Sequence, residues 1–430
     1  MKKRGCFLSK SILLGLVSLV PLSGCSPFKI YPEHAVQHHA FIDYWPPAEG
    51  SKALRLAIKD NIDMKGIVTT VGSEYFAENN APAAQDAACL AIARQRGVQI
   101  VGKTNLSEFA VAPSGYNEYY GTPKSPLSHL HTLIPGGSSC GSAVAVARGL
   151  ADVSFGTDTA GSVRVPAACC GVVGLKTTHG LVSIHGVYPV EPKHLDTVGP
   201  IGKNIDYTAQ GMDLLESGFS ARYAAARAAR PSAGGIRVGR LTLKGTDPKI
   251  DRAVDAALVR AGFQVVPLDD EFRKAWDQAG SDGNTVAAAG AYLTDQSYLF
   301  NSTICGRTKA AILLGRLSYP GPYHKALARR EEWQHTLRHV FQKVDLIALP
   351  TLQAPPPPIA PDFRIGILEA FILNLQNTAA VNFAGNPALA VPIPLHHDHI
   401  HLTSLQLVGP PRSEAELLNA GRFVEATEKK

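Results

Sequence analysis

Short apolar runs that alternate with helical segments constrain the fold of this chain most strongly. LRLAI at 54–58 precedes a helical pattern at 86–96, which Gly97 ends, and VQIVGKT follows at 98–104. A run of small residues, suited to a tightly packed helix, then leads into DVSFGTDT at 152–159. Strands that alternate with helices predict a mostly parallel sheet that helices cover on both faces.

The second half of the chain adds further strands and helices. Residues 214–340 are rich in polar helical sequence and carry few motifs. KVDLIALPT at 343–351 is typical of a buried strand. NPALAVPIPL at 386–395 and LTSLQLVGP at 402–410 predict two strands joined by a hairpin, and AELLNAGRFVEAT at 415–427 predicts a terminal amphipathic helix.

The first 24 residues have the order of an export signal. A cationic head is followed by an apolar run at 12–22, by small residues and by Cys25. A run of this length, at about 1.5 Å per residue, is too short to cross a hydrocarbon core about 30 Å thick. We therefore predict a signal peptide at 1–24 and a tether at 25–50 that leads into the folded part.

The end of this segment, Leu22-Ser23-Gly24-Cys25, resembles the bacterial lipobox. The resemblance implies that Cys25 becomes the lipidated first residue of the mature protein, anchored stably in a membrane by several acyl chains. Ser26 after the cysteine implies the outer membrane of a bacterial cell envelope, facing the periplasm. The alternative is an ordinary signal peptide with an incidental cysteine.

The net charge argues against nucleic acid as a partner. The formal net charge is +6, but Lys2, Lys3, Arg4 and Lys10 lie in the predicted signal, which leaves +2 for the rest of the chain. A nucleic-acid-binding domain needs a basic surface in the mature chain. A content of 45% hydrophobic and 18% charged residues is instead typical of a globular domain with a sizeable core.

The cysteines do not suggest a disulfide framework. Of the seven cysteines, five lie after the predicted lipidation site: Cys89, Cys140, Cys169, Cys170 and Cys305. An odd number without a C-x-x-C pair favours buried free thiols over disulfides or a zinc site.

Two glycine–serine clusters lie close together, at 135–142 and 156–164. Glycines permit unusual backbone angles and let a ligand approach main-chain amides, which can bind an anion. Plain turns, a phosphate cradle and an acyl-transfer site are all compatible with such sequence. The phosphate-binding motif G-x-x-x-x-G-K-[ST] is absent, and so is the hydrolase elbow G-x-S-x-G at Ser162.

The stretch from Gly136 to Lys176 closely resembles the signature of the amidase signature family. It contains, in order, GGSS at 136–139, GTDTAGSVR at 156–164 and CGVVGLK at 170–176. Four further blocks match the family in order: AIKDNIDMKGIVTT from 57, VGKTNLSEFA from 101, LDTVGPIGKN from 195 and NFAGNPALAVP from 382.

The resemblance implies one domain over 51–430, with a three-layer α/β/α fold around a large mixed sheet. It also implies an amidohydrolase that needs no cofactor and cleaves the carbon–nitrogen bond of a small-molecule amide. The divergent region at about 214–340 is expected to face the substrate.

The matching motifs also imply the catalytic residues. Lys59 would be the base, Ser138 a proton relay with a cis peptide bond, and Ser162 the nucleophile. The oxyanion hole would be formed by the amides of Thr159, Ala160, Gly161 and Ser162.

These roles are chemically reasonable for a lysine that is buried. A serine hydroxyl is a poor nucleophile until a base takes its proton. A lysine has an ordinary pKa of about 10.4, so it can accept that proton at neutral pH only if burial lowers the pKa. The apolar run before Lys59 is consistent with burial, and strand alternation predicts that Asp60 points to the opposite face.

Several neighbouring residues leave alternatives open. Ser139 either supports the relay by hydrogen bonding or caps the following helix. Arg164 either contacts substrate or pairs with a carboxylate, and Asp158 is expected to be structural. Ala160 and Cys140 stand where the family often has glycine. Alanine costs roughly 1 kcal/mol where φ must be positive, and Cys140 would either perturb the cis bond or be sensitive to oxidation.

Four histidines close the predicted hairpin at 396–401. On a strand, His397, His399 and His401 would share a face and could bind a divalent metal. We expect instead that His396 and the other three lie on a solvated hairpin, and we predict no metal site.

The sequence therefore predicts a membrane-tethered, cofactor-free amidase that acts through an acyl-enzyme on Ser162. One alternative is the ammonia-releasing subunit of a tRNA-dependent amidotransferase, against which the export signal argues. The other is an inactive lipoprotein that uses the cleft for binding, against which the complete set of Lys59, Ser138 and Ser162 argues.

Overall fold

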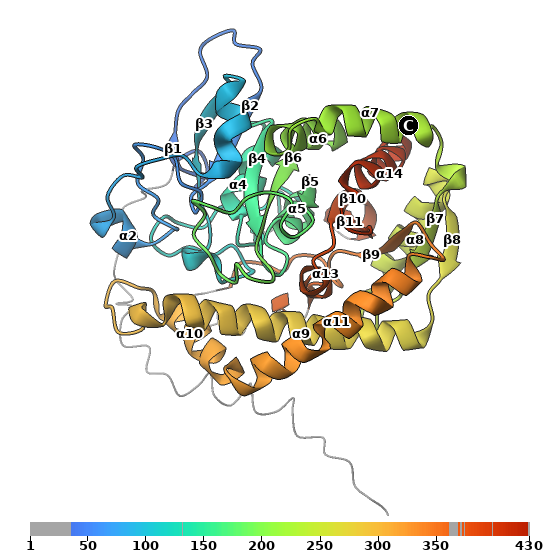
Figure 1. The fold of residues 1–430 in the computed structure, drawn as a ribbon. Helices are drawn as coiled ribbons and strands as arrows, with labels where there is room; N and C mark the ends of the chain where they lie inside the picture. Colours follow the sequence, from blue (N-terminus) through green and yellow to red (C-terminus); the bar gives the residue numbers. More distant parts are fainter. Residues whose placement is uncertain are drawn as a thin grey trace, which may run out of the picture.

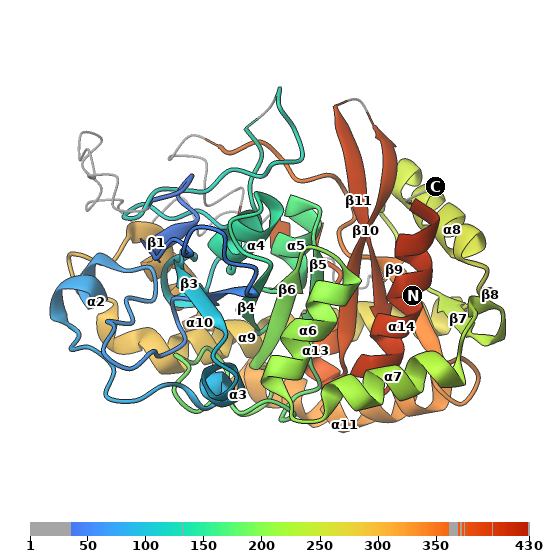
Figure 2. The same ribbon diagram turned by 90° about the horizontal axis from the view of Figure 1, so that it is seen from above.

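A mixed sheet runs through the whole molecule. The computed structural model describes residues 36–428, except 131, 361–368, 370, 371, 374 and 398. Within this part, eleven strands form one sheet in the order β1-β3-β2-β4-β6-β5-β10-β11-β9-β7-β8. Figures 1 and 2 show helices on both sides of the sheet, which gives the three-layer α/β/α arrangement that the resemblance implied.

The strands are short and mostly buried, and their bounds are β1 (Phe41–Tyr44), β2 (Arg55–Lys59), β3 (Gln99–Thr104), β4 (Val153–Asp158), β5 (Val173–Lys176), β6 (Thr197–Gly202), β7 (Arg237–Arg240), β8 (Gln264–Pro267), β9 (Leu346–Pro350), β10 (Ala388–His397) and β11 (Ile400–Val408).

Only four neighbouring pairs of these strands are parallel: β2 with β3, β2 with β4, β7 with β8, and β7 with β9. The expectation of a mostly parallel sheet, drawn from alternation alone, is therefore wrong. The physical reason is that β6 inserts antiparallel between β4 and β5, and that β1, β10 and β11 also pair antiparallel with their neighbours. Periodicity gives the order of elements along the chain, but not where a later strand inserts.

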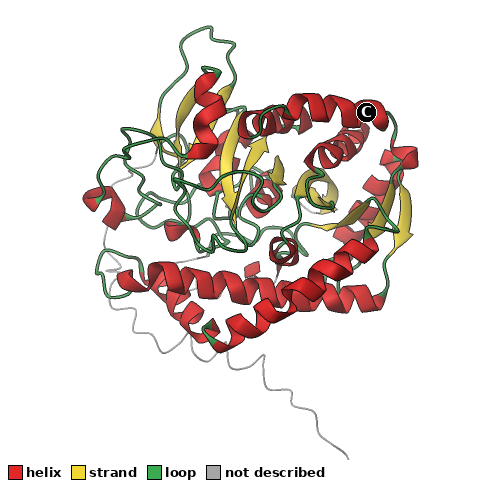
Figure 3. Ribbon diagram, viewed as in Figure 1, coloured by secondary structure: helices red, strands yellow, loops and turns green. Residues whose placement is uncertain are grey.

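The helices that cover the sheet are α2 (Glu74–Asn79), α3 (Ala91–Gln95), α4 (Cys140–Ala147), α5 (Arg164–Cys170), α6 (Ile205–Leu215), α7 (Phe219–Ala229), α8 (Pro248–Ala261), α9 (Asp270–Asp295), α10 (Gly306–Ser318), α11 (Gly321–Val340), α13 (Ala379–Ala384) and α14 (Glu414–Glu428). In Figure 3 the strands form the layer between these helices. The polar segment at 214–340 supplies the long helices α9 and α11, which lie together below the sheet in Figure 1.

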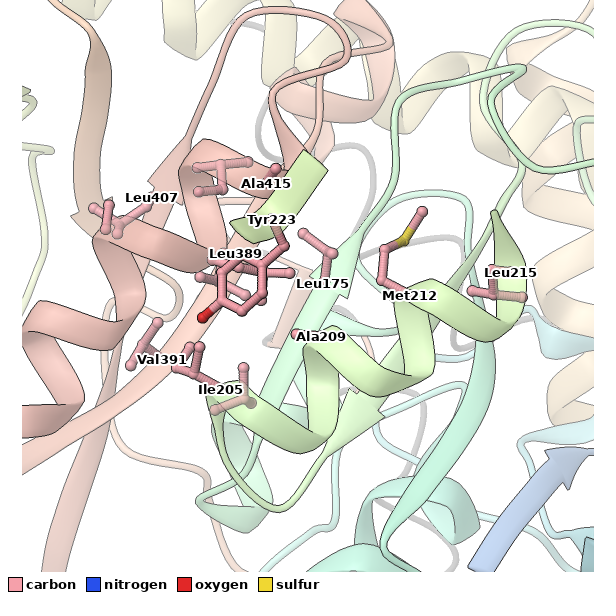
Figure 4. Packing of buried hydrophobic residues seen from close by; sticks show 14 of the residues in the cluster. Leu175, Ile205, Ala209, Met212, Leu215, Tyr223, Leu389, Val391, Leu407 and Ala415 are labelled. Atoms are coloured by element: carbon pink, nitrogen blue, oxygen red, sulfur yellow. The ribbon is translucent and has the colours of Figure 1, made fainter. Parts of the chain in front are cut away.

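The largest apolar cluster joins both halves of the chain. Leu175 of β5 and Leu389 of β10 pack with Met212 of α6 and with residues of α7 and α14 (Figure 4). Burial of apolar surface on this scale is the main favourable term in folding. The two halves of the sheet therefore share one core.

The topology brings the motif-bearing loops to one edge of the sheet. Because β2 and β4 are parallel neighbours, their carboxyl ends meet there. Lys59 ends β2, and the loop at 159–163 follows β4.

The predicted lipidation site, Cys25, lies outside the described residues. In the part of the chain that is described, no helix has the length and hydropathy of a membrane span. The prediction of free thiols is confirmed: Cys89, Cys140, Cys169 and Cys170 are buried, and Cys305 is partly buried.

Candidate active site

Lys59 is completely buried at the end of β2. Its Nζ lies 2.8 Å from Ser138 Oγ and 2.7 Å from Thr157 Oγ1. Burial lowers the pKa of Lys59 to about 7, and nearby acidic groups oppose this shift only in part, because a low-dielectric interior disfavours the charged amine. A substantial share of Lys59 is therefore neutral near pH 7, and a neutral amine can accept a proton.

A second buried lysine, Lys176, shows that a lowered pKa alone does not identify a candidate base. Burial also lowers the pKa of Lys176 to about 7. Its Nζ, however, donates to the main-chain oxygens of Thr177 at 2.9 Å and Asn386 at 2.8 Å. A carbonyl has no proton to give. The contact with a hydroxyl, rather than the pKa, distinguishes Lys59 as a candidate base.

Asp60 faces away from Lys59, as strand alternation predicted. Its Oδ1 lies 2.9 Å from Lys103 Nζ, and both side chains are completely buried. It also accepts hydrogen bonds from the amide and the hydroxyl of Thr70. Asp60 therefore pairs with Lys103 rather than with Lys59, which has no carboxylate within ion-pair distance in the described part of the chain.

Ser138 lies in the loop that leads into α4. The peptide bond between Gly137 and Ser138 is cis, as the resemblance implied. The loop is fixed from outside by hydrogen bonds from the Gly137 amide to Pro113 O at 2.7 Å and from the Ser107 amide to Ser138 O at 3.1 Å. The Ser138 hydroxyl is thereby held against Lys59.

Ser139 occupies the N-cap position of α4, but its side chain makes no capping hydrogen bond. Its hydroxyl donates instead to Thr157 O at 3.3 Å, and its amide donates to Ser162 O at 3.3 Å. The helix-capping alternative is therefore wrong. Ser139 ties the start of α4 to both β4 and the turn that carries Ser162.

Cys140 begins α4 without disturbing the cis bond two residues earlier. The side chain is buried, and its Sγ donates to Asn105 O at 3.7 Å. Burial raises the pKa of this thiol to about 12. A thiol that stays protonated is a poor nucleophile, so sensitivity to oxidation is not favoured here.

Ser162 lies in the turn between β4 and α5 and is partly exposed. Gly161 before it has φ +140°, and a Cβ at this position would lie 2.3 Å from Thr378 Oγ1, so only glycine fits. Among the described residues, the Ser162 hydroxyl makes no hydrogen bond, so no bond joins it to Ser138 in this structure. Catalytic hydrogen bonds often form fully only when substrate is bound.

The loop before Ser162 is held from both sides. The Thr159 hydroxyl donates to Asp196 Oδ1 at 2.7 Å, and the Ala160 carbonyl accepts a hydrogen bond from Thr378 Oγ1. Ala160 does not have a positive φ, so the alanine carries no backbone cost.

The loop also carries consecutive main-chain donors. The amide N–H groups of Ala160, Gly161 and Ser162 have no acceptor among the described residues. Consecutive unpaired amides can stabilise a developing oxyanion. These amides lie in the segment that the resemblance implied would form the oxyanion hole.

Arg164 is completely buried and holds the loop. It donates to both carboxylate oxygens of Asp158 at 3.1 and 3.0 Å, to Thr378 O at 3.2 Å, to Gln406 Oε1 at 2.7 Å and to Asn382 Oδ1. Burial alone would raise the pKa of Asp158, but the Arg164 guanidinium holds it at about 2. Of the two alternatives for Arg164, pairing with a carboxylate is the one that the contacts support.

The histidine-rich segment forms a hairpin, as predicted. His397 of β10 pairs with Ile400 of β11, and its Nε2 lies 3.5 Å from Asp247 Oδ2. Within the described ranges, no three His, Cys, Asp or Glu side chains are grouped so that they could hold a metal ion.

Two residues that touch the site were not singled out from the sequence. Thr157 receives the second hydrogen bond of Lys59, and Asn61 Nδ2 donates to the same Thr157 Oγ1 at 3.1 Å. Both lie inside blocks that match the family, which was the one available signal. Their contacts depend on the pairing of β2 with β4.

Comparison with known proteins agrees with this geometry. The family model described as Amidase matches residues 53–418. The 2-amino-5-chloromuconic acid deaminase of Comamonas testosteroni is 34% identical over 399 residues, which cover 87% of this chain and 81% of the relative. A glutamyl-tRNA(Gln) amidotransferase subunit of Halobacterium salinarum is 31% identical over 410 residues, which cover 86% of this chain and 94% of that relative.

A solved structure extends the comparison to the fold. The crystal structure of a glutamyl-tRNA(Gln) amidotransferase subunit from Thermotoga maritima superposes with a TM-score of 0.73 at 25% identity, covering 90% of this chain and 86% of that one. Fold and relatives together define an enzyme that hydrolyses the carbon–nitrogen bond of amides. The chain belongs to the amidase family.

Proposed function

We propose that the enzyme hydrolyses a carboxamide through an acyl-enzyme on Ser162, with Ser138 as proton relay and Lys59 as base. The observation that carries this proposal is the 2.8 Å contact between Lys59 Nζ and Ser138 Oγ in a fully buried setting. A hydroxyl next to a neutral amine can pass its proton on and take another.

In the acylation step, Lys59 accepts the Ser138 proton while Ser138 accepts the proton of Ser162. The Ser162 oxygen attacks the carbonyl carbon, and the carbonyl electron pair moves to oxygen. The amides of Ala160, Gly161 and Ser162 would stabilise that negative charge, and one such donor is typically worth about 3 kcal/mol. The tetrahedral intermediate then expels the amine, which takes back the proton from Lys59 through Ser138.

Deacylation repeats these steps, with water in place of the Ser162 hydroxyl as the attacking group. Water loses its proton through Ser138 to Lys59, and the oxygen of Ser162 leaves and recovers that proton. The products are a carboxylic acid and the free enzyme. Asp158 and Arg164 take no part in proton transfer, since they pair with each other and fix the turn.

The names of the relatives favour a second candidate, release of ammonia from glutamine for an amidotransferase complex. That activity would require partner subunits. We favour a free-standing amidase, because the predicted signal at 1–24 directs the chain out of the compartment where tRNA is charged.

A fluorophosphonate probe tests the proposed nucleophile. We expect the chain without residues 1–25 to be labelled, and Ser162→Ala not to be labelled. Lys59→Ala and Ser138→Ala should be labelled at least ~10³-fold more slowly, because each breaks the proton path. Asp43→Asn, which changes an exposed residue of the edge strand β1, is the matched control and should match the parent.

Absence of labelling in a folded parent would favour the binding-protein alternative. Ammonia release from glutamine, in preference to other carboxamides, would favour the amidotransferase alternative.

We also propose that the chain is exported and lipidated at Cys25, as the Leu22-Ser23-Gly24-Cys25 sequence implies. Expression of the full chain in a Gram-negative host should place it in the outer-membrane fraction. Cys25→Ser should remove it from that fraction, since one signal peptide without acyl chains does not anchor stably. Equal partitioning of both proteins would contradict lipidation.

A further inference from the structure

A small cavity lined by both polar and apolar side chains lies beside Lys59. Its lining includes Asn61, Thr157, Thr159, Tyr188 and Asp196. Lys59 contacts the cavity wall directly, since its Nζ lies 2.7 Å from Thr157 Oγ1. The cavity is therefore one hydrogen bond removed from the proposed base.

The Thr157 hydroxyl accepts two hydrogen bonds and donates none to a described residue. Its Oγ1 accepts from Lys59 Nζ at 2.7 Å and from Asn61 Nδ2 at 3.1 Å, which occupies both lone pairs of the hydroxyl oxygen. The O–H proton of Thr157 has no acceptor among the described residues. A buried donor left unpaired costs free energy.

The complementary acceptor lies beside it. Asn61 Oδ1 is buried and has no hydrogen-bond partner in the described part of the chain. Exchanging the positions of Oδ1 and Nδ2 of Asn61 is not favoured, because Nδ2 lies 3.5 Å from Tyr188 O. After the exchange, Asn61 Oδ1 would face the Tyr188 carbonyl oxygen, and the two oxygens would repel each other. One unpaired donor and one unpaired acceptor thus line the same cavity.

We propose that this cavity holds a water molecule that accepts the Thr157 O–H and donates to Asn61 Oδ1, and that Asn61 is a positioning residue for Lys59. The inference rests on the proposed function for its catalytic consequence. Buried waters typically make about three hydrogen bonds to groups that are otherwise unsatisfied, and the Asp196 carboxylate in the wall offers a third.

The consequence for the base follows from the direction of the hydrogen bonds. A neutral lysine has two N–H donors and one lone pair, and the lone pair must face Ser138 to take its proton. If the Thr157 O–H were free to turn, it would donate to that lone pair and block it. The water and Asn61 keep the Thr157 hydroxyl an acceptor toward Lys59, so the lone pair stays directed at Ser138.

A high-resolution crystal structure tests the water site without reference to activity. We expect one ordered water within hydrogen-bond distance of both Thr157 Oγ1 and Asn61 Oδ1. Asn61→Leu, which has nearly the same shape but no polar atoms, should lose that water. A cavity without an ordered water in the parent would overturn the proposal.

Kinetics test the positioning role. Asn61→Leu should lower kcat and the rate of fluorophosphonate labelling at least tenfold, while KM changes less than twofold. Asn61→Asp should move the acidic limb of the rate profile to higher pH, because a negative charge near Lys59 stabilises its protonated form. Asn79→Leu on the exposed helix α2 is the matched control and should behave as the parent, and thermal unfolding reports whether each variant folds.

The outcomes separate this inference from the proposed function. If the parent is not labelled at all, the proposed function fails, and the crystal structure alone decides the water site. The positioning role is overturned if the parent is active and a folded Asn61→Leu variant has the same kcat and the same acidic limb of the pH–rate profile as the parent. If Asn61→Leu does not fold, the positioning role is overturned when the acidic limb of the pH–rate profile of Asn61→Asp is the same as that of the parent.

Discussion

At the scale of single residues, burial defines what each cation in this enzyme can do. Lys59, Lys103 and Arg164 are all completely buried. Lys103 and Arg164 pair with Asp60 and Asp158, whereas among the described residues Lys59 makes its hydrogen bonds to hydroxyls. The motif predicted the position of Lys59, but its neutral state follows from contacts that the sequence does not contain.

We predict that activity rises with pH through about 7. Below this value Lys59 is protonated and cannot accept a proton, and above it the neutral amine accumulates, since burial lowers its pKa to about 7. The measurement is kcat/KM, or the rate of fluorophosphonate labelling, from pH 5 to 9. A rate that does not change across this range would argue against Lys59 as the base, and Lys59→Arg, which stays charged, should be inactive throughout.

Arg164→Met is predicted to destabilise the fold by about 3–5 kcal/mol, because it leaves the buried Asp158 carboxylate without its charged partner. Urea unfolding at pH 7 measures the change. The double variant Arg164→Met/Asp158→Asn should recover part of the loss, since the unpaired charge is then gone. Full stability of the single variant would show that the pair does not hold the turn.

At the scale of elements, the turn between β4 and α5 is the most constrained segment of the site. Asp158 ends the strand, Arg164 begins the helix, and their ion pair closes the turn around Gly161 and Ser162. Asp158 Oδ2 also accepts the Val163 amide at 3.1 Å. The free amides of the turn are therefore held rigidly in place.

Gly161→Ala is predicted to slow the reaction at Ser162 strongly without unfolding the protein. The new Cβ would meet Thr378 Oγ1 at 2.3 Å, and φ +140° is strained for alanine. We expect fluorophosphonate labelling to slow at least ~10²-fold, the size of the loss when an oxyanion donor is displaced, while circular dichroism stays the same.

Ala160→Gly is the matched control for that variant, because Ala160 does not have a positive φ. Its labelling rate should stay within about threefold of the parent, as expected when a few tenths of a kcal/mol of backbone entropy change. Equal effects of the two substitutions would contradict the conformational argument.

The elements themselves were largely predictable from sequence, and their arrangement was not. The runs at 54–58, 98–104 and 152–159 correspond to β2, β3 and β4, and the late hairpin corresponds to β10 and β11. The helical pattern at 86–96 corresponds to a 3-10 helix at Ala88–Leu90 that continues into α3 at Ala91–Gln95. Strand pairing depends on contacts between distant segments, which local patterns cannot express.

The same limit applies to the site. Matching motifs located Lys59, Ser138 and Ser162, because each lies in a block with several fixed neighbours. They did not identify Thr157 or Asn61 as parts of the hydrogen-bond network around Lys59, and they left Ser139 and Arg164 undecided. Those assignments require distances between side chains from different strands and loops.

At the scale of the whole molecule, the sheet makes the described chain one body. β10 pairs with β5 on one side and with β11 on the other, so it joins the strands of the first half to those of the second. The main apolar cluster likewise contains Leu56 and Phe155 from the first half and Leu346 and Leu405 from the second.

We therefore predict that the folded part of the chain, from β1 onward, unfolds in one cooperative transition. Trp45 packs against the largest cluster, whereas Trp276 and Trp333 belong to a second cluster beneath the sheet. Variants of the chain without residues 1–25 that keep only Trp45, or only the other two, should show the same melting temperature by fluorescence and by circular dichroism. Two separate transitions would indicate two independent units.

The complete burial of the Lys59 side chain also has a consequence for attaching this enzyme to a solid support. Amine-reactive groups couple to neutral amines, and near pH 7 Lys59 holds more neutral amine than an ordinary lysine in water does. Yet no reagent in solution reaches Lys59, because its side chain is completely covered. Coupling through amines would therefore consume exposed lysines such as Lys52, Lys124 and Lys244 and spare the lysine that we propose as the base.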